Sequence, residues 1–195
     1  MSERTRAELA EHAVVIAALG PLLEELDEVT ARIRASLEGG GKVLAFGNGG
    51  SAADAQHLAA ELIGRYKRTR RPFPAMSLAV DPSVVSCIAN DFGHDEVFAR
   101  QVEGLAQPGD VVCGFTTSGR SPSVVRGLAA GRAAGATTVL FSGGDGGAAR
   151  GEADLALLVP STTTARIQEV HLLLLHLLSE EIDAWASGPD GGTSA

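Results

Sequence analysis

Five short apolar runs alternate with segments of helical spacing beyond residue 40, and this alternation constrains the fold more than any other feature. The runs lie at residues 42–47, 75–80, 110–115, 137–142 and 154–159. Helical patterns cover residues 51–65, 82–90, 94–106, 121–134 and 165–187. Strands that are buried on both faces of a parallel sheet read as continuous apolar stretches. Because crossovers are right-handed, helices cover both faces, and the sequence predicts an open parallel α/β sheet.

Residues 1–38 precede this pattern and predict a pair of helices. Gly20 and Pro21 divide the pair, since proline is favoured at the start of a helix. The pair carries more leucines than a small α/β domain needs to cover itself. We therefore expect it to belong to the domain formed by residues 39–187 and to lie at an interface between subunits. The composition of residues 188–195 predicts a disordered tail.

Charge and composition exclude several classes of protein. The net charge of −8 argues against a nucleic-acid-binding surface. The apolar stretch at 171–178 is too short and interrupted to span a membrane, and the polar N-terminus is unlike a secretory signal, so a cytoplasmic location is expected. Cys87 and Cys113 lack metal-type spacing and are expected to be small buried residues. The basic loop (residues 65–72) either is a solvated connection between elements or attracts an anionic substrate through its positive charge.

Two loops at predicted strand ends have compositions suited to a ligand. The glycine loop (residues 47–51, GNGGS) and the hydroxyl loop (residues 116–121, TTSGRS) each lead from a strand into a helix. Ligands bind at the carboxyl ends of parallel strands, and free N–H groups at a helix start attract anions. Four hydroxyls exceed what a helix cap needs, which favours phosphate binding over an ordinary turn. Neither loop fits a nucleotide-binding motif, so no nucleotide cofactor is expected. The loop at 142–147 is expected to be a structural turn.

Two helices carry the candidate chemical groups. His57 and Glu61 are four residues apart and share a helix face, which suits a divalent metal, proton transfer or a plain surface contact. In the last helix, His171 and His176 are about 140° apart and cannot share one small site. Gln168 and Glu169 both fall within about 80° of His176, so periodicity does not choose between them.

Four stretches, in order, resemble the sedoheptulose-7-phosphate (phosphoheptose) isomerase family of the SIS-domain superfamily. They are GNGGSAADAQHLAAELIGRY, CIANDFG, GDVVCGFTTSGRSPSVV and RIQEVHLLLLHLL, and the likeness covers residues 5–186. The resemblance implies a flavodoxin-like, five-stranded sheet and a homotetramer. Packing of the leucine-rich helix pair between subunits adds the expectation that sites lie at subunit interfaces. It also implies conversion of sedoheptulose 7-phosphate into D-glycero-D-manno-heptose 7-phosphate through a cis-enediol.

The resemblance also implies roles for single residues. Glu61 matches the catalytic carboxylate, expected to be the base, and His176 matches the catalytic histidine that serves the oxygens. A zinc site in part of the family is matched by His57, Glu61, Gln168 and His176, which settles the choice in favour of Gln168. The residues that match contacts to the phosphorylated sugar are Asn48, Gly49, Gly50, Ser51, Glu61, Asn90, Asp91, Thr116, Thr117, Ser118, Ser121 and Gln168.

One departure and two alternatives accompany this interpretation. Many members have an acidic residue where this chain has Ala165, so the tuning of a catalytic group is expected to differ. One alternative is an isomerase of another sugar phosphate. The other is a non-catalytic, phosphosugar-binding or regulatory SIS protein, which is expected to lack Glu61 or His176.

Overall fold

A five-stranded, all-parallel sheet forms the centre of the computed structural model, which describes residues 2–188. The strand order is β2-β1-β3-β4-β5. The strands are β1 (Val43–Gly47), β2 (Ala75–Ser77), β3 (Val111–Phe115), β4 (Thr137–Gly143) and β5 (Leu155–Val159). Every residue of β1 and β3 is buried, as their continuous apolar sequences require. The predicted fold class is confirmed.

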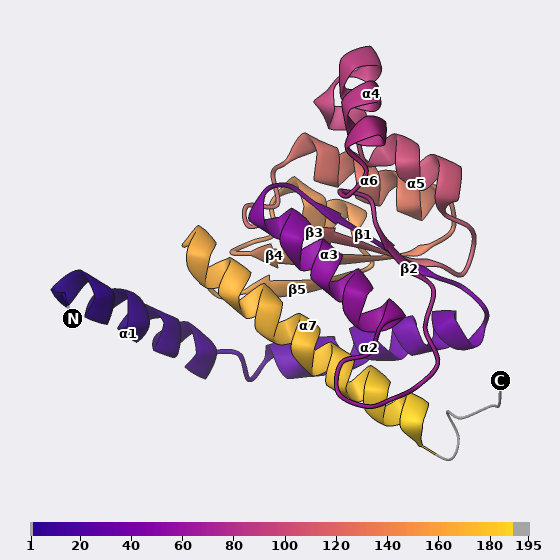
Figure 1. The fold of residues 1–195 in the computed structure, drawn as a ribbon. Coiled ribbons are helices and arrows are strands. Elements are labelled where there is room, and N and C mark those ends of the chain that lie inside the picture. The colour runs from indigo at the N-terminus through magenta and orange to yellow at the C-terminus, as the bar shows by residue number, and fades with distance from the viewer. Residues whose placement is uncertain (1, 189–195) are drawn as a thin grey trace.

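Helices cover both faces of the sheet (Figure 1). They are α1 (Glu3–Ala17), α2 (Leu22–Glu38), α3 (Gly50–Ile63), α4 (Pro82–Phe92), α5 (Ala99–Leu105), α6 (Pro122–Ala133) and α7 (Thr164–Ser187). One core cluster joins α2, α3 and α7 to the sheet, and a second joins α4, α5 and α6 to its other face. This division places the polar faces of α3 and α7 side by side.

Beyond shifts of one or two residues at element ends, the structure differs from the predicted elements in three places. The second strand ends at Ser77 instead of continuing to residue 80, because β2 is an edge strand that pairs with β1 alone. The predicted helix 94–106 is a 3₁₀ turn (His94–Glu96) followed by α5. A further 3₁₀ helix, Ala148–Glu152, carries no periodic pattern and was not predicted.

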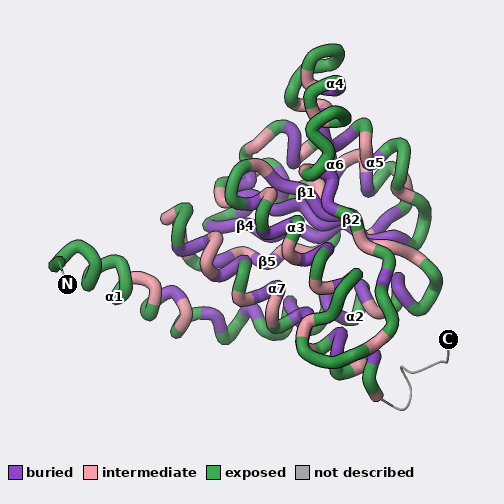
Figure 2. The backbone as a smooth tube through the Cα atoms, viewed as in Figure 1, coloured by how far each residue is buried: buried purple, intermediate pink, exposed green. Residues whose placement is uncertain are grey.

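Two helices project from the body and are exposed over much of their length (Figure 2). On α1, Leu9 and Val14 are 61% and 69% exposed, and on α4 only Ile88 is buried. Cys87 is therefore exposed on α4, which corrects the expectation that it is buried, whereas Cys113 is buried in β3 as expected.

The remaining predictions concern the tail and membrane segments. Of the predicted tail, residues 189–195 lie outside the described part of the chain. Within residues 2–188, no helix combines the length and the apolar character needed to cross a membrane.

Candidate active site

The hydroxyl loop follows β3 and is held in a defined turn. The Thr116 hydroxyl accepts a hydrogen bond from the N–H of Gly119 (3.2 Å), and the Ser118 hydroxyl accepts one from the N–H of Arg120 (3.2 Å). Ser121 occupies the N-cap of α6, but its side chain makes no capping hydrogen bond. Pro122 has no N–H, and the N–H groups of Val124 and Val125 donate to the Ser121 carbonyl (3.0 and 3.1 Å). The Ser121 hydroxyl remains available to an anion, which favours a phosphate site over a simple cap.

A hollow of about 480 Å³ opens beside this loop, at the carboxyl ends of β3, β4 and β5. Thr117, Ser118 and Arg120 line one side, and the turns after β4 and β5 line the other. The segment after the loop at 142–147 contacts the hydroxyl loop, since the carbonyl of Gly119 accepts a hydrogen bond from the N–H of Ala149 (2.9 Å). Gly143, Gly144 and Asp145 of the loop itself line the hollow, and its role as a structural turn stays a prediction.

The glycine loop leaves the sheet next to the hydroxyl loop, because Gly47 of β1 and Phe115 of β3 are partners in the register. The Asn48 amide donates to the hydroxyl of Ser123 on α6 (2.9 Å), which ties the two loops together. At Gly50, a Cβ atom would lie 2.4 Å from the side-chain amide of Gln168. Only glycine therefore allows Gln168 to lie against the start of α3.

Three chemical groups meet where α3 and α7 lie side by side. Nε2 of His57 is 2.9 Å from Oε1 of Glu61, and Nε2 of His176 is 3.4 Å from Nε2 of His57. One ligand atom from each residue lies within 4.8 Å of the other two, which suits a metal ion. Burial lowers the pKa of His176 below its ordinary value, and the neighbouring His57 lowers it further. A neutral His176 can accept a proton or bind a metal.

The structure separates the other polar residues of α7. Both carboxylate oxygens of Glu169 are engaged by Arg166 (2.6 and 2.7 Å), and His12 of α1 also contacts one of them (2.6 Å). Gln168 shares a face with His176 but lies about 12 Å nearer the start of α7, given the rise of 1.5 Å per residue. Within one subunit, the structure thus gathers three of the four predicted metal ligands and places Gln168 toward the glycine loop.

Asn90 and Asp91 lie far from these groups in the fold. Both are exposed on α4, which packs on the opposite face of the sheet from α3 and α7. The Asn90 amide donates to Oδ1 of Asp91 (2.7 Å). A single subunit therefore does not bring these two predicted substrate contacts to the α3–α7 seam.

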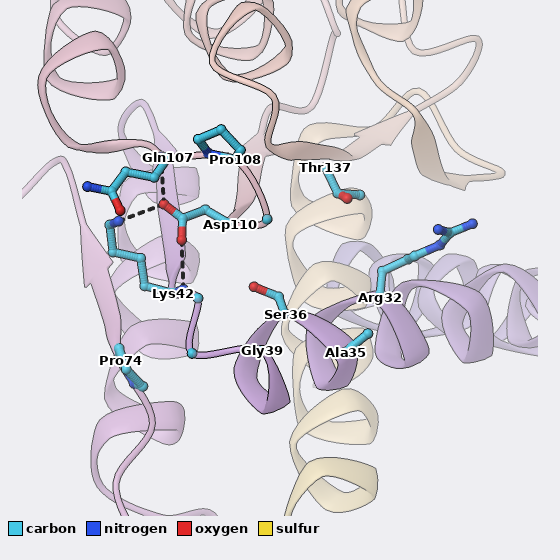
Figure 3. Close-up of a pocket in the computed structure, with 13 residues that line it drawn as sticks. Arg32, Ala35, Ser36, Gly39, Lys42, Pro74, Gln107, Pro108, Asp110 and Thr137 are labelled. Carbon is cyan, nitrogen blue, oxygen red and sulfur yellow. Dashed lines mark hydrogen bonds and ion pairs between the residues drawn. The ribbon is translucent and has the colours of Figure 1, made fainter.

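A second hollow, of about 500 Å³, lies at the amino ends of the strands and is structural (Figure 3). The Asp110 carboxylate in it accepts hydrogen bonds from the backbone N–H of Lys42 (2.9 Å), from Nζ of Lys42 (2.6 Å) and from the N–H of Gln107 (2.8 Å). These bonds join the segments that enter β1 and β3. Ligands of parallel sheets bind at the opposite edge.

A buried acid and a buried imidazole lie on the inner sides of α3 and α7. Oδ2 of Asp54 and Nδ1 of His171 are 4.0 Å apart, and His171 is enclosed by Phe115 and Phe141. Burial raises the pKa of Asp54 to about 6 and lowers that of His171 to about 4. At neutral pH we therefore expect a carboxylate beside an uncharged imidazole.

Asp54→Asn should become more stable relative to the wild-type protein as the pH rises from 4 to 6. The pKa of Asp54 is raised in the folded protein. Its favourable contribution to the free energy of unfolding is therefore present at low pH and is lost as the pH rises through about 6. Between pH 4 and 6, we expect the free energy of unfolding of Asp54→Asn to rise relative to that of wild type by about 1–2 kcal/mol, allowing for solvent screening. Urea unfolding of both proteins at several pH values measures it, and a constant difference across this range would contradict the burial argument.

Some residues at the site were missed by the sequence analysis. Tyr66 stacks on His176 with ring centroids 5.3 Å apart, although its basic loop carries no periodic signal. Ser123 holds Asn48 from the next helix. Both residues lie within stretches that carry the resemblance, but no spacing singled them out, because they act through contacts between distant segments.

Known proteins agree with this fold. Residues 13–143 match the SIS domain. The phosphoheptose isomerase of Paramagnetospirillum magneticum is 48% identical over 181 residues, which cover 92% of this chain and 94% of that protein.

Two solved structures agree over almost the whole chain. The phosphoheptose isomerase from Neisseria gonorrhoeae gives a TM-score of 0.88 at 38% identity, covering 93% of this chain and 98% of that chain. The phosphoheptose isomerase from Francisella tularensis gives a TM-score of 0.90 at 30% identity, covering 94% of this chain and 100% of that chain. The chain therefore belongs to the phosphoheptose isomerase family of SIS-domain proteins.

Proposed function

We propose that the protein interconverts sedoheptulose 7-phosphate and D-glycero-D-manno-heptose 7-phosphate. The observation that carries this is the meeting of His57, Glu61 and His176 where α3 and α7 lie side by side, in a chain that also carries the hydroxyl loop at the end of β3. Membership of the phosphoheptose isomerase family supports the same reaction. The three-residue group supplies acid–base chemistry, and the hydroxyl loop supplies an anchor for the phosphate.

The reaction moves a proton between C1 and C2 of the sugar through a cis-enediol. We assign Glu61 as the base that removes the proton from one carbon and returns it to the other. His176, neutral because its pKa is lowered, transfers protons at the oxygens or assists ring opening. The phosphate bound at the hydroxyl loop orients the reacting carbons, so remote binding energy contributes to the rate.

The same three side chains fit a zinc ion. Two imidazole nitrogens and one carboxylate oxygen within 4.8 Å are a usual catalytic donor set for zinc. We propose that His57, Glu61 and His176 hold it, whereas Gln168, the fourth predicted ligand, lies about 12 Å away along α7 within the same subunit. When bound, zinc supplies Lewis acidity toward a carbonyl oxygen.

We further propose a homotetramer with sites at subunit interfaces. Exposed apolar side chains on the projecting helices support it, among them Leu9 and Val14 on α1 and Phe92 on α4. Asn90 and Asp91 stand next to Phe92, on the face opposite to their own subunit's site. In an assembly they can serve the site of a neighbouring copy, which would reconcile this position with their predicted role as substrate contacts.

Incubation with sedoheptulose 7-phosphate, with and without a chelator, tests the function. We expect the aldose 7-phosphate to form and the rate to fall at least about tenfold after chelation, with recovery on addition of Zn²⁺. An unchanged rate in the chelated, metal-free protein would remove the zinc proposal. Faster turnover of a hexose phosphate would indicate another sugar-phosphate isomerase, and binding without turnover would indicate a regulatory protein.

A further inference from the structure

The basic loop (residues 65–72) is folded onto α7 and is not a free connection. The carboxylate of Asp183 accepts hydrogen bonds from the backbone N–H groups of Lys67 (2.6 Å) and Arg68 (2.8 Å). Glu180 adds ion pairs to the side chains of the same two residues (3.0 and 2.6 Å). Neither acidic residue was singled out by the sequence, yet together they fix the path of this loop.

Arg70 completes a three-way connection between α3, the basic loop and α7. Its Nε donates to Asp183 (2.8 Å), while its terminal nitrogens donate to the carbonyls of Glu61 (2.6 Å) and Leu62 (2.8 Å). The last carbonyls of a helix favour such a cation. The side chains of Arg70 and Asp183 are 1% and 0% exposed, so this is a buried ion pair with its hydrogen bonds satisfied.

Asp183 is ionised despite its burial. Burial by itself raises the pKa of its carboxyl group, but the N–H groups of Arg68 and Lys67 and the Arg70 guanidinium outweigh burial. The pKa of Asp183 therefore lies below its ordinary value. The loop stays attached over the whole neutral range.

This attachment places Tyr66 over His176. The two rings are 5.3 Å apart between centroids and 24° from parallel, and Nζ of Lys67 lies 4.7 Å from the centroid of the Tyr66 ring. Asp183 lies about two helical turns after His176, on the same face of α7. The residue that anchors the loop and the residue that the loop covers are thus fixed to each other by one helix.

We propose that Tyr66 is a positioning residue for His176, held over its imidazole by the buried Asp183–Arg70 pair. The tyrosine ring limits rotation of the imidazole and excludes water from one of its faces. The proposal rests on the proposed role of His176 in isomerisation. Tyr66 acts through His176 and is not itself assigned a step of the reaction.

Tyr66→Ala and Tyr66→Phe separate the ring from its hydroxyl. We expect Tyr66→Ala to lower kcat about tenfold, with KM within about threefold of wild type, because a mispositioned catalytic group costs rate more than binding. Tyr66→Phe should retain kcat within about twofold. Arg71→Ala, a change at an exposed residue of the same loop, is the matched control and should leave both constants unchanged. Wild-type kcat in Tyr66→Ala, or equal losses in Ala and Phe, would overturn the proposal.

A second readout does not depend on activity. A stacked aromatic ring shifts the NMR signals of the His176 ring protons upfield, and these signals are assigned by their absence from His176→Asn. The shift should be lost in Tyr66→Ala, kept in Tyr66→Phe and reduced in Arg70→Lys, which cannot reach Asp183 and both carbonyls at once. If the protein lacked isomerase activity but its variants showed this pattern of NMR shifts, the proposed function would be contradicted and the position of Tyr66 over His176 would stand. An unchanged shift in Tyr66→Ala would overturn the positioning role alone.

Discussion

Replacing Glu61 with glutamine should lower kcat about 10³-fold while leaving the affinity for the phosphorylated sugar within about threefold. Glutamine has nearly the same shape but cannot accept the proton that must leave carbon. Glu61 is only 16% exposed at its side chain and contacts His57 at 2.9 Å, so water has little access to take its place. Phosphate binding at the hydroxyl loop, formed by other residues, should persist.

Four measurements make this test specific. Turnover is followed with sedoheptulose 7-phosphate, binding by calorimetry, and proton transfer by incorporation of solvent deuterium at the reacting carbons. Bound zinc is measured in each protein, because Glu61→Gln also removes a predicted metal ligand. Glu28→Gln, at an exposed residue on α2 that pairs with Arg32, is the control and should match wild type. Deuterium incorporation at the wild-type rate in Glu61→Gln would exclude Glu61 as the base.

Gly119→Ala should disrupt the hydroxyl loop more than any other single methyl group added there. Gly119 has φ +64°, and a Cβ atom would lie 1.9 Å from the carbonyl oxygen of Gly146. That oxygen belongs to backbone and cannot turn aside, so one of the two loops must move. We expect the free energy of unfolding to fall by about 2–4 kcal/mol and kcat/KM by about 100-fold.

Two variants identify the cause of such losses. Gly104→Ala, on α5 with no atom within 4 Å of the added Cβ, should instead raise the free energy of unfolding by about 0.5–1 kcal/mol. Ser121→Ala removes a hydroxyl that makes no capping bond, so it should weaken phosphate binding without loss of stability. Phosphate affinity unchanged in both Gly119→Ala and Ser121→Ala would place the phosphate elsewhere.

Much of the fold could be predicted because its signals are local. Continuous apolar runs gave five parallel strands, and their glycine and hydroxyl endings predicted where a ligand would bind. The errors lie where local pattern competes with packing. Cys87 sits in an apolar stretch that reads as core, but α4 projects from the sheet and leaves the thiol exposed.

Periodicity constrained the site less. It gives the direction of a side chain around the axis of its own helix, but it does not say which residues of a neighbouring helix that side chain lies beside. Gln168 and Glu169 both satisfied the angle to His176. The structure turns Glu169 toward Arg166 and His12, and places Gln168 beside Gly50. The pairing of His57 with Glu61 is a property of one helix, and the sequence could indicate it.

By itself, then, the sequence determined the parallel sheet, the position of the glycine and hydroxyl loops at strand ends, and the His57–Glu61 pair, since each depends on residues close together in the chain. The family resemblance predicted that His176 joins this pair, and the tertiary structure brings the three side chains together. Only the tertiary structure decided that Tyr66 covers His176 and that Asn90 and Asp91 lie on the opposite face. These placements depend on how α3, α4, α7 and the basic loop pack. Packing is set by contacts between segments many residues apart, which no local spacing records.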